Sequence, residues 1–157
     1  MFNKRINKQC SLGDLGELAI KAYYDLLGES YTRSDNPYDS VKDATNARGT
    51  VEVKTQVPFI NKDAFSIKEN QFNKVMSATT VYFVSAPTDR PYKDDGCIYE
   101  CLDPSKLEWF TEWTRDNRKM ILYPRSQKGL TIVHRIDTID ILNQMMEHSS
   151  SKKNWTK

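Results

Sequence analysis

The residues best suited to chemistry lie in one short segment, residues 38–56, which reads YDSVKDATNARGTVEVKTQ. Glu52 and Lys54 stand two positions apart in a run of valine and threonine that is typical of a β-strand. Because side chains alternate across a strand, Glu52, Lys54 and Gln56 are expected on one face and the intervening valines on the other. A carboxylate and an ammonium are therefore expected side by side.

A second acid precedes this strand by the length of a hairpin. The polar stretch ATNARG predicts a turn between strands at 38–43 and 50–57. With the turn centred near Asn46, Asp39 is expected opposite Lys54 and close to Glu52. Asp43 is the rival acid, but the same geometry places it beside the turn, so we prefer Asp39.

Two carboxylates and one lysine in a small volume predict a divalent metal site. Neighbouring carboxylates repel each other unless a cation lies between them. Mg²⁺ is typically held by one or two carboxylates together with substrate phosphate and water, and it polarises the phosphate and activates the attacking water. Lys54 is placed to orient that water or to stabilise charge on the phosphate oxygens. The alternative is a solvated ion pair on an exposed hairpin, which contributes little.

Helices and strands around this hairpin follow from the hydrophobic pattern. Ser11 and Asp14 predict the start of a helix over 12–27, which ends at Gly28. Ser66 and Glu69 predict a second helix over 66–78. Gln71 shares the face of Ile67 and Val75 on this helix, so it either points inward towards the site or is a buried polar residue whose hydrogen bonds are satisfied.

The rest of the chain predicts further strands and helices. TTVYFVSAP and CIYECL are expected strands, DPSKLEWFTEWTRDN a helix, and KMILYP with LTIVHRI a second hairpin. DTIDILNQMMEH predicts a last helix before a flexible basic tail at 149–157. This order predicts one domain, 1–148, of the α/β or mixed α+β class, with a central mixed sheet flanked by helices.

The order of elements resembles the PD-(D/E)xK nuclease superfamily, which includes restriction endonucleases and Holliday junction resolvases. The matching segments are GDLGELAIKAYY for the first helix, NPYD for the first motif, VEVKTQ for the second, and SIKENQFNKVM with VYFV for the unit that follows. The resemblance covers about residues 11–86. It implies a four-stranded mixed sheet in the order α-β-β-β-α-β, for which one strand is missing here and is expected within VPFINKDAF.

The resemblance implies a role for individual residues. Asp39 and Glu52 would be metal ligands together with the carbonyl of Val53, and Lys54 would be the catalytic lysine. Glu17 would match the helix glutamate that completes the site in many members. From its place on the face of Lys54, Gln56 is expected either to contact phosphate or organise the site, or to be a plain polar residue at the end of the strand. The sequence departs from the family where Tyr38 separates Pro37 from Asp39.

Composition allows this function without specifying it. The net charge is +2, and no stretch of 18 apolar residues or signal-peptide core is visible. Three cysteines, Cys10, Cys97 and Cys101, indicate free thiols in a reducing cytoplasm. A zinc site at Cys97, Cys101 and His134 is an alternative with unusual spacing.

We therefore expect an endodeoxyribonuclease that uses Mg²⁺ or Mn²⁺ and acts on DNA, with branched or junction DNA among the candidate substrates. The small size fits a phage-like nuclease, and a homodimer is a candidate assembly. The alternative is a nuclease-like fold that serves only as a nucleic-acid-binding or assembly module.

Overall fold

The computed structural model describes residues 11–34, 43–57, 63–88 and 95–155, with side chains up to residue 148. Its elements, in chain order, are α2 (Leu12–Leu27), β1 (Tyr31–Arg33), β2 (Ala44–Asn46), β3 (Gly49–Gln56), β4 (Ala64–Lys68), the 3-10 turn η2 (Glu69–Gln71), α3 (Phe72–Ser77), β5 (Thr80–Ser85), β6 (Cys97–Cys101), the 3-10 turn η3 (Pro104–Lys106), β7 (Phe110–Trp113), β8 (Lys119–Pro124), β9 (Thr131–Arg135) and α4 (Ile139–Trp155).

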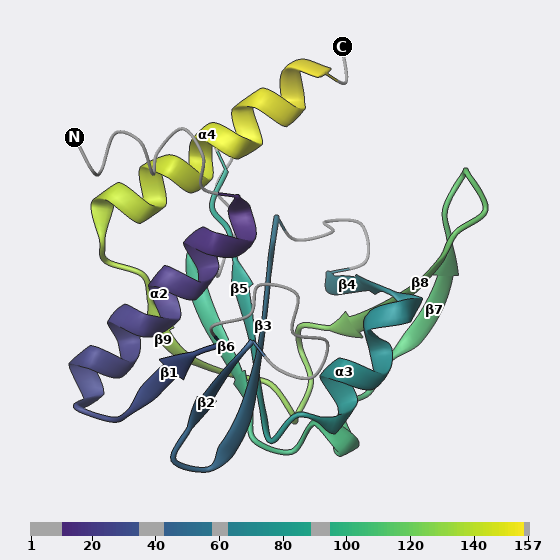
Figure 1. Cartoon of the computed structure of the whole chain (residues 1–157). Helices are drawn as coiled ribbons and strands as arrows, with labels where there is room; N and C mark the ends of the chain where they lie inside the picture. Colours follow the sequence, from purple (N-terminus) through teal and green to yellow (C-terminus); the bar gives the residue numbers. More distant parts are fainter. Residues whose placement is uncertain (1–10, 35–42, 58–62, 89–94, 156–157) are drawn as a thin grey trace.

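The described strands form two sheets (Figure 1). The larger has six strands in the order β1-β2-β3-β5-β6-β9, and the smaller has three in the order β4-β8-β7. Strands β3 and β5 run parallel, while the other neighbouring strands run antiparallel. The expected fold class, a mixed α/β fold with a central mixed sheet flanked by helices, is confirmed.

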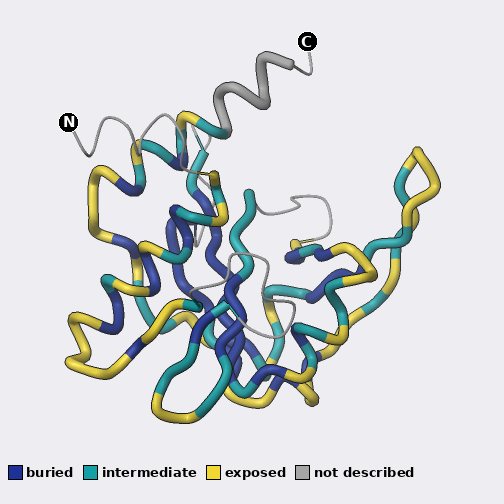
Figure 2. Tube along the Cα trace, in the orientation of Figure 1, coloured by how far each residue is buried: buried dark blue, intermediate teal, exposed yellow. Residues whose placement is uncertain are grey.

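The six-stranded sheet separates two hydrophobic cores. On one face, α2 and α4 cover the side chains of Val51, Val53 and Tyr82. On the other face, α3 and the three-stranded sheet cover Val81 and Phe83. Figure 1 shows this division, and Figure 2 shows that buried residues are concentrated in the central strands. Alternate residues of β3 therefore face different layers.

Helix α2 begins and ends as predicted. Ser11 and Asp14 form a reciprocal capping box, and Gly28 ends the helix in the left-handed conformation with φ 70°. Gly16 faces β3 so closely that a Cβ there would lie 1.6 Å from Thr55 Oγ1. A glycine is therefore required where the helix contacts the sheet.

The hairpin differs from the prediction in its first strand and its turn. Among the described residues the first strand of the hairpin is β2, which begins at Ala44, and only residues 47 and 48 separate it from β3. Residues 38–42 of the predicted strand lie outside the described residues. The Asn46 side chain accepts hydrogen bonds from the backbone N–H groups of Arg48 and Gly49. This tight turn shifts the register, so that Ala44 pairs with Val51.

The third strand beside the hairpin is also not where the sequence indicated. Strand β4 does lie near the expected segment, but it pairs with β8 in the smaller sheet. In the larger sheet the third strand is β1, upstream of the hairpin, where it pairs with β2. The short polar sequence of β1 gave no strand signal.

Three further predictions are wrong in the C-terminal half and around α3. Residues 66–68 belong to β4, and the helix predicted over 66–78 is confined to α3. The helix predicted in DPSKLEWFTEWTRDN is instead η3 and β7. Strands β8 and β9 both exist, but they lie in different sheets and do not form a hairpin with each other.

The C-terminal helix is confirmed and is longer than expected, because α4 continues into the segment predicted as a tail. Its Met145 is fully buried in the core beneath α2. Within the described parts of the chain, no helix is both long and apolar enough to cross a membrane.

Candidate active site

Glu52 is a fully buried carboxylate in the middle of β3. It pairs with Val81 of β5, and its side chain leaves the sheet on the face covered by α3. Its Oε2 lies 3.0 Å from Lys54 Nζ and 3.6 Å from Lys74 Nζ. Apart from these two lysines, no described residue donates a hydrogen bond to either of its carboxylate oxygens. A fully buried carboxylate that is held by lysine ammonium groups is costly to desolvate, which indicates a role beyond stability.

Asp43 is the acid that the structure places beside Glu52. It directly precedes β2, and its Oδ2 accepts a hydrogen bond of 2.9 Å from the backbone N–H of Val53. Its Oδ1 lies 3.2 Å from Lys74 Nζ. Both carboxylates therefore contact the same ammonium. Asp39, the preferred acid from the sequence, lies outside the described residues.

Two lysines neutralise these two carboxylates. Lys54 Nζ contacts Glu52 and also donates a hydrogen bond of 2.8 Å to Gln71 Oε1 in η2. Lys74 reaches the site from α3 and contacts both acids. The inward orientation predicted for Gln71 is thus found, although Gln71 lies in a 3-10 turn.

The pKa of Glu52 is raised to about 7: burial is the largest cause, the neighbouring Asp43 carboxylate acts in the same direction, and Lys54 and Lys74 oppose both. Burial alone lowers the pKa of Lys74, but Glu52 and Asp43 outweigh it and raise that pKa. Near neutral pH, the Glu52 carboxyl can therefore release its proton and bind a divalent cation instead.

Glu17 lies on the opposite side of β3, on α2. It forms an ion pair of 3.1 Å with Arg33 Nε of β1. Burial raises the pKa of Glu17, Arg33 lowers it, and Asp43 and Asp14 raise it. The charge of Asp43 therefore influences the pKa of Glu17, but the residue that pairs directly with Glu17 is Arg33.

Gln56 is engaged in holding the two sheets together. Its Nε2 donates to the Ser66 carbonyl at 3.0 Å, and its Oε1 accepts from the Ser66 backbone N–H at 2.5 Å. These bonds satisfy the free edge of β4. The geometry therefore gives Gln56 a structural task at the rim of the site.

The oxygen atoms present here fit a hard divalent cation. In a β-strand the N–H and C=O of one residue point to the same side, so the Val53 carbonyl shares the strand edge with Asp43. Two carboxylates and a carbonyl, with water and phosphate, are a donor set suited to Mg²⁺ or Mn²⁺. The buried Glu52 carboxylate, now paired with lysines, offers oxygens for such a cation.

Among the described residues, no group of three or more His, Cys, Asp or Glu side chains is placed to hold a metal ion. The zinc alternative therefore receives no support within this part of the chain. Cys97 and Cys101 are buried free thiols on one strand, β6. A cation at Glu52 and Asp43 would depend on backbone, water and phosphate oxygens as well.

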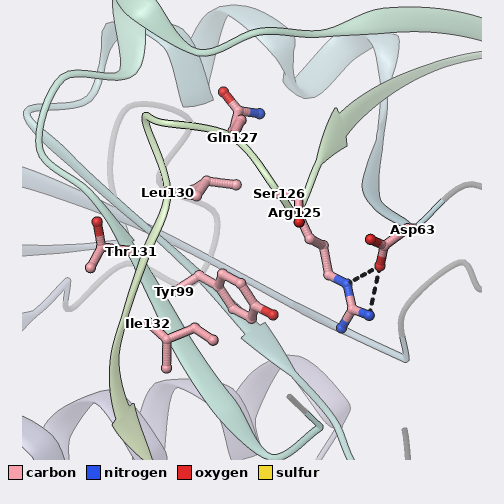
Figure 3. Close-up of a pocket in the computed structure, with 8 residues that line it drawn as sticks. All are labelled: Asp63, Tyr99, Arg125, Ser126, Gln127, Leu130, Thr131 and Ile132. Atoms are coloured by element: carbon pink, nitrogen blue, oxygen red, sulfur yellow. Dashed lines mark hydrogen bonds and ion pairs between the residues drawn. The ribbon is translucent and has the colours of Figure 1, made fainter. Parts of the chain in front are cut away.

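Figure 3 shows a separate cavity of about 520 Å³, and neither Glu52 nor Asp43 is among the described residues that line it. Arg125 lines it and is already paired with Asp63, at 2.7 Å from Arg125 Nη2 to Asp63 Oδ1. The Arg125 Nη1 also donates to Ser85 Oγ at 3.4 Å. Among the described residues that line this cavity, Asp63 is the one carboxylate, in contrast to the paired acids of the site on β3.

Comparisons with known proteins add no assignment: no family model, no curated protein and no solved structure matches the chain.

Sequence reasoning missed two charged partners of the predicted residues, Lys74 and Arg33. Lys74 follows Gln71 by three positions, which places both on one side of η2 and α3. That spacing is the only signal of Lys74 in the sequence. Arg33 was hidden in a stretch interpreted as a turn.

Proposed function

We propose that the chain is a metal-dependent endodeoxyribonuclease of the PD-(D/E)xK type that hydrolyses phosphodiester bonds with Mg²⁺ or Mn²⁺. The observation that carries this proposal is the convergence of Asp43, Glu52 and Lys54 at one edge of β3, with the Glu52 carboxylate fully buried and 3.0 Å from the Lys54 ammonium. A solvated surface pair would not bury its carboxylate.

The arrangement of elements supports the same proposal. Counting within the larger sheet and its helices, the order is α2, β1, β2, β3, α3, β5, which is the α-β-β-β-α-β order that the resemblance implies. The two charged motif residues lie on β3, which pairs in parallel with β5. In this proposal Asp43 is the first acid, because it is the described acid beside Glu52, while Asp39 lies outside the described residues.

Each residue then has a task. Asp43, Glu52 and the Val53 carbonyl would hold the cation, which supplies a Lewis acid for the phosphate and activates water. Lys54, held by Gln71, positions its ammonium beside Glu52, where it orients the attacking water or stabilises charge on the phosphate. Glu17, on the other side of β3, would assist through the electrostatic interaction between its carboxylate and that of Asp43.

The partner is DNA, and the substrate form is tested with a panel. Supercoiled plasmid, linear duplex, a four-way junction, a flap and a single strand are each incubated with Mg²⁺ or Mn²⁺. We expect nicking of at least one substrate, and its complete loss in EDTA. A homodimer and a cytoplasmic location remain predictions to be checked in the same preparation and in cells.

Matched variants decide whether this site does the cutting. Glu52→Gln and Lys54→Met keep the side-chain volumes and should each lower the cleavage rate at least about a hundredfold. Circular dichroism must show that both variants fold. A wild type that binds DNA but never cuts with either metal would favour the alternative, a binding or assembly module.

A further inference from the structure

Lys74 occupies the space between the two acidic residues of the site. Its Nζ lies 3.2 Å from Asp43 Oδ1 and 3.6 Å from Glu52 Oε2. Its side chain is only 15% exposed, so the ammonium is held within the site and not in open solvent. Lys54, in contrast, contacts Glu52 from one side and is anchored by Gln71.

The charges of the site are balanced without a metal. When both carboxyl groups are ionised, Asp43 and Glu52 carry two negative charges, which the two positive charges of Lys54 and Lys74 balance. A divalent cation contacting both acids would leave an excess of positive charge in a largely buried volume. It would also compete with Lys74 for the same oxygens, because Lys74 is the cation that touches both.

We propose that Lys74 is a resident counter-ion that holds Asp43 and Glu52 together in the metal-free protein and must withdraw before a divalent cation binds between them. The inference rests on the proposed function, because it takes Asp43 and Glu52 as metal ligands. Lys74 is thus a positioning residue that sets the metal affinity. Its long side chain, once displaced, remains beside the site, where an anionic phosphate would attract it.

The test is a direct titration of Mn²⁺ into the DNA-free protein at one fixed pH, followed by the electron paramagnetic resonance signal of free Mn²⁺. Lys74→Met removes the competing ammonium and should bind Mn²⁺ about tenfold more tightly, or about 1.4 kcal/mol. Lys74→Gln is the second variant, should the apolar side chain unfold the protein. Thermal melts establish that each variant is folded.

Two lysine controls separate displacement from a general charge effect. Lys54→Met removes a cation that contacts Glu52 but not Asp43, so its gain should be clearly smaller than that of Lys74→Met. Lys106→Met removes an equal charge from an exposed side chain and should leave the affinity unchanged.

The outcomes distinguish the two proposals. Unchanged or weaker Mn²⁺ binding in both Lys74 variants, or an equal gain in Lys54→Met, overturns the inference. Glu52→Gln is included because its loss of Mn²⁺ binding tests the metal site itself. If Glu52→Gln abolishes binding while Lys74→Met has no effect, the proposed function stands and the inference fails. If Mn²⁺ binds neither the wild type nor the Lys74 variants, both fail.

Discussion

The carboxylate of Asp43 accepts a hydrogen bond of 2.9 Å from the backbone N–H of Val53, one residue after Glu52 on the neighbouring strand. Strand β2 begins only at Ala44, so Asp43 takes the place of a strand residue at the edge of β3. This bond fixes the acid beside the strand that carries Glu52 and Lys54. Asp43 is therefore positioned in the site by lying where the pairing of β2 with β3 ends.

The identity of the first acid gives the first prediction. Asp43→Asn keeps the shape of the side chain and an acceptor for the Val53 N–H, but it removes the charge. We expect cleavage to fall at least about a hundredfold, as for other removed transition-state contacts. The rate is measured on whichever DNA the wild type cuts, at saturating Mn²⁺. Asp39→Asn is the comparison, and loss of cleavage in Asp39→Asn alone would return the role to Asp39.

The second prediction concerns Gln56, whose bonds to Ser66 join the two sheets. Gln56→Ala leaves the Ser66 N–H and C=O without this partner and should lower the free energy of unfolding by about 1–3 kcal/mol. The cleavage rate of the folded variant should stay within a few-fold of the wild type. Urea unfolding and single-turnover cleavage measure the two effects.

Gln71→Ala is the matched comparison, because Gln71 holds Lys54 and not a strand edge. It should slow cleavage and leave stability nearly unchanged. A Gln56→Ala variant that is fully stable but inactive would show that Gln56 belongs to the catalytic machinery, as first expected from the sequence.

The third prediction follows from the raised pKa of Glu52, which is about 7 in the fold against an ordinary value of 4.5. The folded state then binds the Glu52 proton more tightly than the unfolded chain, so ionising Glu52 lowers stability as the pH rises from 4.5 to 7. Glu52→Gln should raise the free energy of unfolding in EDTA at pH 8 by about 1–3 kcal/mol, and the gain should vanish near pH 4.

Glu69→Gln is the control for this pH dependence, because its carboxylate is exposed and paired only with Lys119 at the surface. Denaturant unfolding at several pH values gives the difference from the wild type for both variants. A Glu52→Gln variant that is less stable than the wild type at pH 8 would contradict the raised pKa.

The fourth prediction tests the contact that places α2, and with it Glu17, against β3. A Cβ at Gly16 would meet Thr55 Oγ1 at 1.6 Å, whereas a Cβ at Gly13 meets only Ser11 Oγ at 3.7 Å. Gly16→Ala should therefore lower the free energy of unfolding by about 2 kcal/mol or more. Gly13→Ala, in the same helix, should leave it unchanged or raise it by up to about 1 kcal/mol. Equal melting temperatures of the two variants would show that α2 does not pack as described.

Much of the site was predictable from periodicity. The alternation in VEVKTQ correctly divides β3 into a valine face towards α2 and a charged face towards α3. The capping box at Ser11 and the stop at Gly28 predicted α2 because both act through local hydrogen bonds. Strand alternation and helix caps were sufficient to predict the two faces of β3 and the ends of α2, because both depend on residues that are close in sequence.

The remainder depends on contacts between distant segments. The Ser66–Glu69 spacing suggested a helix start, but pairing with β8 makes residues 64–68 a strand. The same partner makes residues 110–113 a strand, although their aromatic spacing suits a helix. The turn of only two residues in the hairpin brings Asp43 beside β3, and nothing local placed Lys74 between two carboxylates.

The decisive measurement of metal-dependent cleavage at Glu52 is single-turnover cleavage of DNA by the wild type and by Glu52→Gln, with Mn²⁺ and then with EDTA. We expect the wild type to cut with Mn²⁺ and EDTA to stop it. We expect folded Glu52→Gln to cut at least about a hundredfold more slowly. Cleavage by Glu52→Gln at the wild-type rate, or no cleavage by the wild type across the substrate panel with either metal, would contradict the proposed function.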